Sequence, residues 1–79
     1  MDKEVRLLNS LKVGEKCIVK DLTMSGKARR RMFDLGLIKA TEVEAVLKNP
    51  SGDLTAYYIR GALIALRAED SSQIEVYTV

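Results

Sequence analysis

The sequence lacks histidine and tryptophan, and it has a single cysteine, Cys17, among 79 residues. Without histidine the chain cannot form a Ser–His or Cys–His nucleophile pair, and it has no imidazole to move protons. One thiol makes neither an internal disulfide nor a zinc site of the Cys/His kind. We therefore expect a protein without enzymatic activity that resides in the reducing cytoplasm.

Long apolar stretches and a secretion signal are missing as well. No apolar run approaches the roughly 18–20 residues of a membrane-spanning helix, so we expect no direct membrane insertion. The charged start, Met1-Asp2-Lys3-Glu4, has no apolar signal-peptide core. With 47% hydrophobic and 30% charged residues the chain is typical of globular proteins. Its length predicts one small domain over residues 1–79.

The positive charge of the chain is concentrated in one short segment. The chain has 13 Lys and Arg against 11 Asp and Glu, a net charge of +2. Four of the basic residues lie between positions 27 and 31 and one acid, Asp34, follows, so this segment carries +3 and the remainder −1. Such a run is either a solvated helix face or a docking surface for an acidic or phosphate-bearing partner.

Residues 25–35 predict the one clear helix of the chain. Ser25 is a candidate N-cap, and Gly36 suits the left-handed residue that often follows a helix. Arg30 lies opposite the apolar face on a helical wheel. The apolar residues recur at helical spacing on that face: Met24, Ala28, Met32 and Leu35.

The remaining segments predict short strands separated by turns. The turn cluster at 49–53, which holds the single proline, predicts a hairpin between its neighbours. The continuous apolar run 62–66 predicts a central strand buried on both faces. Strands are expected at 17–19, 42–48 (with Val43, Ala45 and Leu47 on one face), 54–60, 62–66 and 74–79. Residues 5–11 fit a turn or a single helical turn. Five short strands and one helix predict a mainly β fold built as a small closed or partly open barrel.

One ordered set of residues spans the chain from about Leu8 to Val76. It comprises Gly26-x-x-Arg29-Arg30-Arg31-Met32-x-Asp34-Leu35-Gly36-Leu37, Thr41, Pro50-x-Gly52-Asp53, Tyr58, Arg60-Gly61-x-x-Ile64-Ala65-Leu66-Arg67 and Ile74-x-Val76. This set resembles the FeoA family, small cytoplasmic accessory proteins of bacterial ferrous iron transport. The resemblance implies an SH3-like β-barrel of about five strands, with one short helix inserted after the first strand.

Two loops depart from the family pattern. The family commonly has Pro-Gly-Thr where this chain has Lys39-Ala40-Thr41, and often has proline at the position of Leu54. A glycine at position 40 would suit a positive φ, which is costly for alanine. We therefore expect a turn of a different type at Ala40.

The resemblance also implies a non-enzymatic adaptor function. The expected partner is the cytoplasmic nucleotide-binding domain of a ferrous iron transporter, which the protein would bind and modulate. Arg60 and Arg67 have a second interpretation, which we favour, as strand-end charges that pair with Glu69 or Asp70. The candidate partner-binding residues are Lys27, Arg29, Arg30, Arg31, Arg60 and Arg67.

Metal binding has little support in the residues, although an iron-transport family suggests it. Ferrous iron prefers nitrogen and oxygen ligands, and Glu42 and Glu44 alternate with apolar residues as an ordinary solvated strand face does. Cys17, Met24 and Met32 are expected in the core. We predict no metal site and no cofactor.

Two other functions remain open. One is a metal-responsive regulatory domain, because the resemblance extends to the SH3-like domain of iron-dependent repressors. The other is nucleic-acid binding through the basic helix, a use that small barrels often have. The few aromatic residues are not interleaved with the basic run, which disfavours nucleic acid. Weak self-association through strand edges also remains open.

Overall fold

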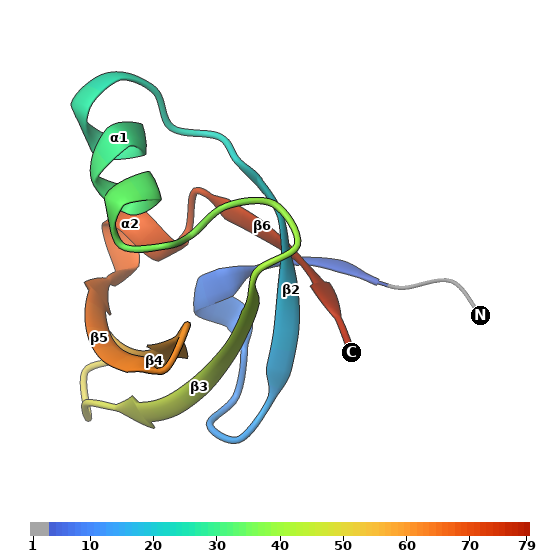
Figure 1. The fold of residues 1–79 in the computed structure, drawn as a ribbon. Coiled ribbons are helices and arrows are strands. Elements are labelled where there is room, and N and C mark those ends of the chain that lie inside the picture. Colours follow the sequence, from blue (N-terminus) through green and yellow to red (C-terminus); the bar gives the residue numbers. More distant parts are fainter. Residues whose placement is uncertain (1–3) are drawn as a thin grey trace.

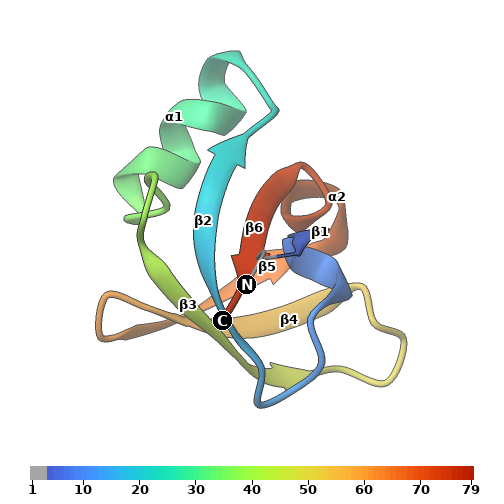
Figure 2. The ribbon, with the colours of Figure 1, turned by 90° about the vertical axis from the view of Figure 1, so that its right-hand side faces the viewer.

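A computed structural model describes residues 4–79 and contains one six-stranded antiparallel sheet in the order β1-β6-β2-β3-β4-β5 (Figure 1). The sheet is strongly curved, and α1 lies at the upper left of both ribbon views, to the left of β2 (Figure 2). In chain order the elements are β1 (Val5–Leu7), the 3-10 turn η1 (Leu8–Ser10), β2 (Lys16–Leu22), α1 (Gly26–Asp34), β3 (Glu42–Lys48), β4 (Leu54–Ile59), β5 (Ala62–Arg67), α2 (Ala68–Ser71) and β6 (Ile74–Thr78). Neither helix of residues 4–79 is long and apolar enough to cross a membrane.

The core is built by the inward side chains of the strands, closed at one end by α1. On β2, β3 and β4 the buried residues alternate with outward ones, as a half-buried strand requires. Met32 is the buried residue of α1. The core comprises Leu8, Leu11, Cys17, Val19, Leu22, Met24, Met32, Leu37, Val43, Ala45, Tyr57, Ile59, Leu66, Ile74 and Val76. The prediction that Cys17, Met24 and Met32 are core residues is confirmed.

The mainly β prediction is confirmed, but the strand count and the closed barrel are not. The sixth strand, β1, comes from a segment predicted as a turn, and it pairs with β6 through Val5 opposite Tyr77. The helix therefore follows the second strand instead of the first. In residues 4–79 the two edges, β1 and β5, do not pair with each other. The helix at 26–34 and the hairpin β3–β4 agree with their predictions.

Two apolar positions face outward although the sequence predicted them inside. β5, expected to be central, is an edge strand whose Leu63 is 57% exposed. The β4–β5 hairpin places β5 at the edge of the sheet, where no element of residues 4–79 covers its outer face. Leu47 is 62% exposed because a bulge after Ala45 shifts the register of β3 against β4. A shift of one residue turns a side chain to the other face.

The crossover from α1 to β3 contains one of the two non-glycine residues of positive φ in residues 4–79. Gly36 has φ 98° and ends the helix as predicted, but Ala40 has φ 72°. The expected change of turn type at Ala40 is therefore wrong, and the alanine adopts the conformation that costs roughly 1–3 kcal/mol. Hydrogen bonds hold it there: the Ala40 amide donates to the Val19 carbonyl at 2.9 Å, and the Val19 amide donates to the Thr41 carbonyl at 2.9 Å.

Candidate docking surface on helix α1

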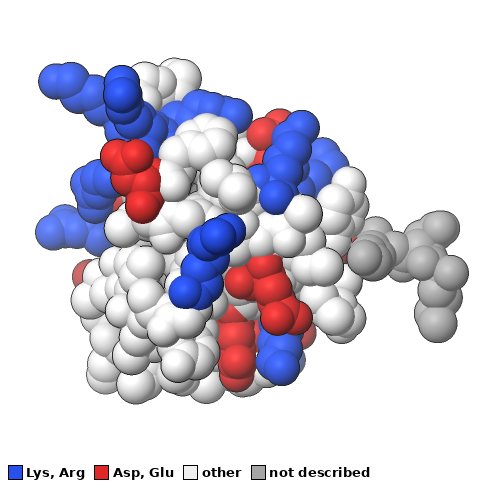
Figure 3. Space-filling model, in the orientation of Figure 1, with Lys and Arg blue, Asp and Glu red and all other residues white. Residues whose placement is uncertain are grey.

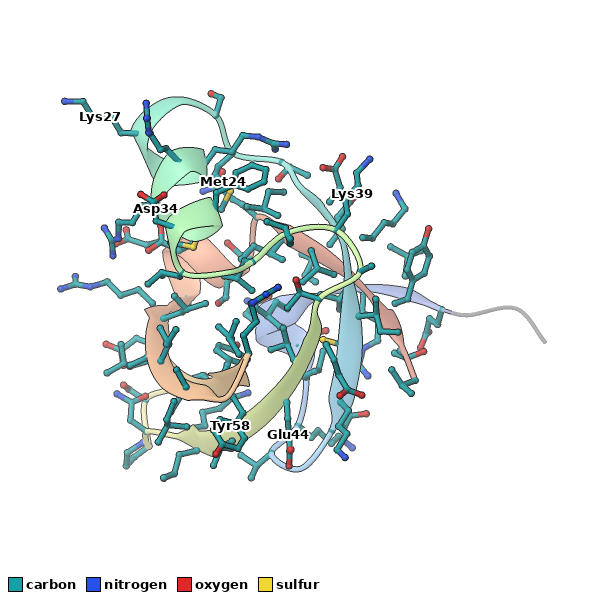
Figure 4. All side chains as sticks on the ribbon, viewed as in Figure 1. Met24, Lys27, Asp34, Lys39, Glu44 and Tyr58 are labelled. Carbon is teal, nitrogen blue, oxygen red and sulfur yellow. The ribbon has the colours of Figure 1, made fainter. Side chains whose placement is uncertain are left out.

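Helix α1 presents three exposed basic side chains, Lys27, Arg30 and Arg31. The space-filling view shows basic side chains gathered on the part of the surface that α1 forms (Figure 3). Lys27 extends from the start of the helix away from the body of the protein (Figure 4). We call these three residues the basic surface. The predicted concentration of charge on one element therefore corresponds to an exposed surface in the structure.

The start of α1 adds positive potential to the basic surface. Its first turn contains no acidic residue, and the Ser25 side chain makes no capping hydrogen bond, so Ser25 serves as N-cap residue through its extended backbone alone. Uncapped N–H groups at a helix start behave as a partial positive charge. Asp34, the one acid in the helix, lies at the opposite end. An acidic partner would therefore meet the highest potential near Lys27 and Arg30.

Arg29 differs from its basic neighbours because it is engaged within the protein. Its Nη1 donates a hydrogen bond to the Leu22 carbonyl at 2.5 Å and lies 4.0 Å from the Asp21 carboxylate. Its guanidinium also lies 5.1 Å from the centre of the Phe33 ring, a cation–π distance. Arg29 thus fastens α1 to the end of β2, and less of its charge is available to a partner.

Arg60 lies at the other end of α1. Together with Gly61 it forms the two-residue turn between β4 and β5, and both have positive φ, 50° and 84°, as a type I′ turn requires. Its side chain crosses Gly36 so closely that a Cβ on Gly36 would lie 2.6 Å from Arg60 Cδ. The Thr41 hydroxyl donates to the Gly36 carbonyl at 3.0 Å. Gly36, Thr41 and Arg60, which are part of the family resemblance, therefore lie together at the C-terminal end of α1.

Arg67 lies apart from α1, at the end of β5. It lines a shallow hollow together with Asp53 and Glu69. The pKa of Asp53 is lowered, mainly because the hydroxyl of Ser51 and the amide of Asn49 donate hydrogen bonds to its carboxylate, with a smaller effect from Arg67. The predicted pairing of Arg60 or Arg67 with Glu69 or Asp70 is not observed in residues 4–79. The ion pairs there are Arg6–Glu15, Lys20–Glu75 and Arg29–Asp21.

Two further basic residues, which the sequence reasoning missed, lie on the neighbouring side of the crossover. Lys20 on β2 and Lys39 in the crossover loop line one hollow together with Tyr77; Lys39 is labelled in Figure 4. Lys20 is 3.3 Å from the Glu75 carboxylate, so its charge is partly compensated. No sequence signal could join these residues, because they come from three separate elements.

The described residues do not fit a metal ion. Residues 4–79 contain no group of three His, Cys, Asp or Glu that could hold one. The thiol of Cys17 is fully buried, and burial raises its pKa to about 11, so it stays protonated. Glu44 faces Lys16 across the β2–β3 pair instead of another acid.

The aromatic side chains do not form a stacking platform beside the basic surface. Tyr57 is buried, and the Arg29 guanidinium lies 5.1 Å from the centre of the Phe33 ring, which is 43% exposed. Tyr58 and Tyr77 lie on β4 and β6. A stacking platform for single-stranded nucleic acid needs several exposed rings next to basic residues, and Phe33 is the one aromatic residue of α1.

The fold and the comparisons with known proteins define the class. The curved antiparallel sheet with a helix at its crossover is that of a small SH3-like domain, and solved structures of such proteins match it closely. A family model described as "FeoA domain" matches residues 6–78. The chain belongs to the FeoA family. A search of curated protein sequences finds no match.

Three solved structures illustrate the likeness. A FeoA-like protein from Clostridium acetobutylicum is 30% identical with a TM-score of 0.88, and the match covers 100% of this chain and 91% of that one. Iron(II) transport protein A from Clostridium thermocellum is 30% identical with a TM-score of 0.90, covering 94% and 46%. A manganese-dependent transcriptional repressor has a TM-score of 0.88 at 14% identity, covering 100% and 44%. At that identity the repressor shares the fold alone.

Proposed function

We propose that this protein is a non-enzymatic accessory protein of ferrous iron transport, acting in the cytoplasm. It binds an acidic surface on the cytoplasmic nucleotide-binding domain of the ferrous iron transporter and modulates that domain. Membership of the FeoA family supports the transport role. The docking role rests on one observation: Lys27, Arg30 and Arg31 are exposed, and in the part of the chain that the structure describes they make no ion pair.

The chemistry of the basic surface suits recognition of a protein partner by charge. Unpaired cations on one small helix create a local potential that steers an acidic surface to it, even when the net charge of the whole chain is small. Arg29 and Arg60 hold the two ends of the helix against the body. The partner therefore meets a helix of fixed orientation, and its binding should weaken as salt is added.

The test is a binding titration with the isolated cytoplasmic domain of the transporter. The triple variant Lys27→Glu, Arg30→Glu and Arg31→Glu reverses the basic surface and touches no buried residue. We expect its affinity to fall at least about tenfold, or about 1.4 kcal/mol. Added salt should weaken the binding of the native protein more than that of the variant.

A matched control reverses three exposed lysines elsewhere in the fold. Lys12, Lys16 and Lys48 lie on the loop and strands at the other end of the sheet, and changing them to Glu alters the net charge by the same amount. The control should keep its affinity to within about twofold. Equal losses in both triple variants, or no loss in the first, would refute the assignment of the basic surface.

A further inference from the structure

Strand β5 leaves one side of its backbone without a partner. In residues 4–79 it pairs with β4 alone, and the sheet ends there. No backbone hydrogen bond outside the sheet ladders involves Leu63 or Ala65 in that part of the chain. An edge strand of six residues with free N–H and C=O groups is a template for another strand.

The residues whose backbone points outward follow from the hairpin geometry. The two-residue turn makes Ile59 and Ala62 a hydrogen-bonded pair, and such pairs alternate along antiparallel strands. Even-numbered residues of β5 therefore bond to β4, and the Ala68 amide continues this order by donating to the Asp53 carbonyl at 2.9 Å. The outward backbone groups belong to Leu63, Ala65 and Arg67.

This edge lacks the features that normally prevent pairing. Between Ala62 and Leu66 it has no charged residue, no proline and no bulge. The opposite edge, β1, is three residues long and carries Arg6, which is tied to Glu15 at 3.2 Å. Short and charged edges resist pairing, and long apolar ones favour it. β5 is therefore the edge that is better suited to pair with a further strand.

The outer face beside this edge is also apolar. Tyr58 lies opposite Leu63, and Ala56 lies opposite Ala65, in the β4–β5 register. Their neighbours Leu47 and Leu54 are exposed as well. A strand added to β5 would extend this apolar face instead of covering charged groups.

We propose that β5 pairs with β5 of a second copy of this chain, antiparallel, about a two-fold axis through Ala65. The two small Ala65 side chains then lie opposite each other, and Ile64 lies opposite Leu66 of the second copy. Each Ala65 amide donates to the Ala65 carbonyl of the other copy. Each Arg67 amide donates to the Leu63 carbonyl, while the Arg67 carbonyl keeps its hydrogen bond from the Ser71 hydroxyl at 3.2 Å.

Charge complementarity favours a second copy as the occupant. In this register the Arg67 side chain enters the row formed by Leu63, Tyr58 and Glu44, which are neighbours across β5, β4 and β3. It therefore approaches the ring of Tyr58 of the second copy, a favourable partner of a guanidinium. The Glu44 carboxylate lies one strand further on, where it also faces Lys16. A register centred on Arg67 would place two arginines opposite each other, which is unfavourable. Two-fold pairing of identical surfaces also uses both β5 edges at once, so this contact ends at a dimer.

The test is sedimentation velocity over a series of concentrations up to the millimolar range. The native protein should show a reversible monomer–dimer equilibrium. Ala65→Lys and Ala65→Glu each place like charges at the axis and should weaken self-association at least about tenfold. A 1:1 mixture of the two variants should restore association, because lysine then faces glutamate. Ala65 is exposed, so both variants should fold, and circular dichroism checks this.

The control is Ala28→Lys, which adds the same charge at an exposed alanine of α1. It should leave self-association unchanged. Amide hydrogen exchange gives a second readout, because the Ala65 amide should become protected as concentration rises while that of the exposed Ala28 does not. A native protein that stays monomeric, or a mixture that fails to associate, would overturn the proposal. Loss of transporter-domain binding on Ala65→Lys in a monomeric protein would assign the edge to that domain instead.

Discussion

Helix α1 packs against the sheet and the β4–β5 hairpin is part of it, and the two regions differ in chemistry and in how they are attached to the core. α1 is charged and exposed, and Met32 is its buried residue. The hairpin buries Tyr57, Ile59 and Leu66 in the core, and its outer face is apolar. The comparison teaches that a surface carried by few core contacts can change without unfolding the protein. The outer face of the hairpin, in contrast, is carried by strands whose inward side chains form part of the core.

The difference also separates two modes of recognition. The contacts proposed for the basic surface depend on charge, so salt should weaken them. The contact proposed for the β5 edge combines backbone hydrogen bonds with burial of apolar area, and sulfate and similar salts strengthen such burial. One small protein can therefore use both surfaces at once without one partner displacing the other. Four predictions test how far the two regions are independent.

The largest effect is expected at Tyr57, the anchor of the hairpin. Tyr57→Ala empties a fully buried site and should lower the free energy of unfolding by about 3–5 kcal/mol, measured by urea denaturation. Tyr58→Ala, at the next and half-exposed position, is the control and should cost under about 0.5 kcal/mol at low protein concentration. Similar losses in both variants would contradict the anchoring role.

A smaller effect is expected at Met32, the anchor of α1. Met32→Ala should cost about 2–3 kcal/mol, the lower part of the range for buried methionine, because the helix can settle onto the cavity. Amide exchange should quicken in α1 more than in β4. Arg30→Ala, on the exposed side of the same helix, should be nearly neutral. A uniform increase of exchange across the sheet would mean that α1 is as central as the hairpin.

Gly36 lies just after α1 and contacts Arg60 of the β4–β5 turn, so changing these two residues tests whether the helix and the hairpin are independent. Gly36→Ala forces a Cβ into positive φ and against Arg60 Cδ, and should cost about 1–2 kcal/mol. Arg60→Ala removes the side chain that clashes with the new Cβ, so in the Gly36→Ala background it should recover the part of the stability loss that the clash causes. The double variant should therefore lose less than the sum of the single losses, as a double-mutant cycle measures. Full additivity would show that the two regions do not meet there.

The smallest effect concerns pH and again distinguishes the hairpin. Burial raises the pKa of Tyr57 above its ordinary value of 10.0. The stabilisation linked to its neutral form is therefore complete below pH 10 and is lost as pH rises through the raised pKa. Tyr57→Phe should cost under about 1 kcal/mol at pH 7, since its hydroxyl donates one long hydrogen bond to the Leu8 carbonyl at 3.4 Å.

Urea denaturation at pH 8 and above pH 10 measures this effect. The loss of stability with rising pH should be smaller in Tyr57→Phe than in the native protein. Cys17, whose pKa burial raises to about 11, adds to the same slope in both. Tyr58→Phe, which removes a hydroxyl outside the core, is the control. A Tyr57→Phe variant with an unchanged slope would contradict the assignment.

The sequence predicted elements well where periodicity and burial agree. Met32 and the glycine that ends α1 defined the helix, and the proline turn defined the β3–β4 hairpin. The basic surface was also visible in the sequence, because its residues are consecutive on one helix. The family resemblance, carried by residues that converge near Gly36, is confirmed by the family match.

The failures have physical reasons. The apolar run of β5 is the same whether a strand is central or at the edge, since hydropathy does not encode the number of strands beside it. Leu47 is turned outward by a bulge that no turn residue marks. Ala40 shows that backbone hydrogen bonds can hold an alanine in a conformation that propensity disfavours. The internal role of Arg29 depends on Leu22 and Asp21, which precede the helix.

The pairing of β1 with β6 determines where a label or a fused domain can be attached without covering the proposed interfaces. The Thr78 amide donates to the Glu4 carbonyl at 3.0 Å, so the two ends of the described chain lie side by side. The views show the start of β1 and the end of β6 on the side away from α1 and β5 (Figures 1 and 2). A fluorophore, a sensor surface or a fused domain joined at either end is therefore held clear of both proposed interfaces. Immobilisation through one end should leave the basic surface and the β5 edge equally open to a partner in solution.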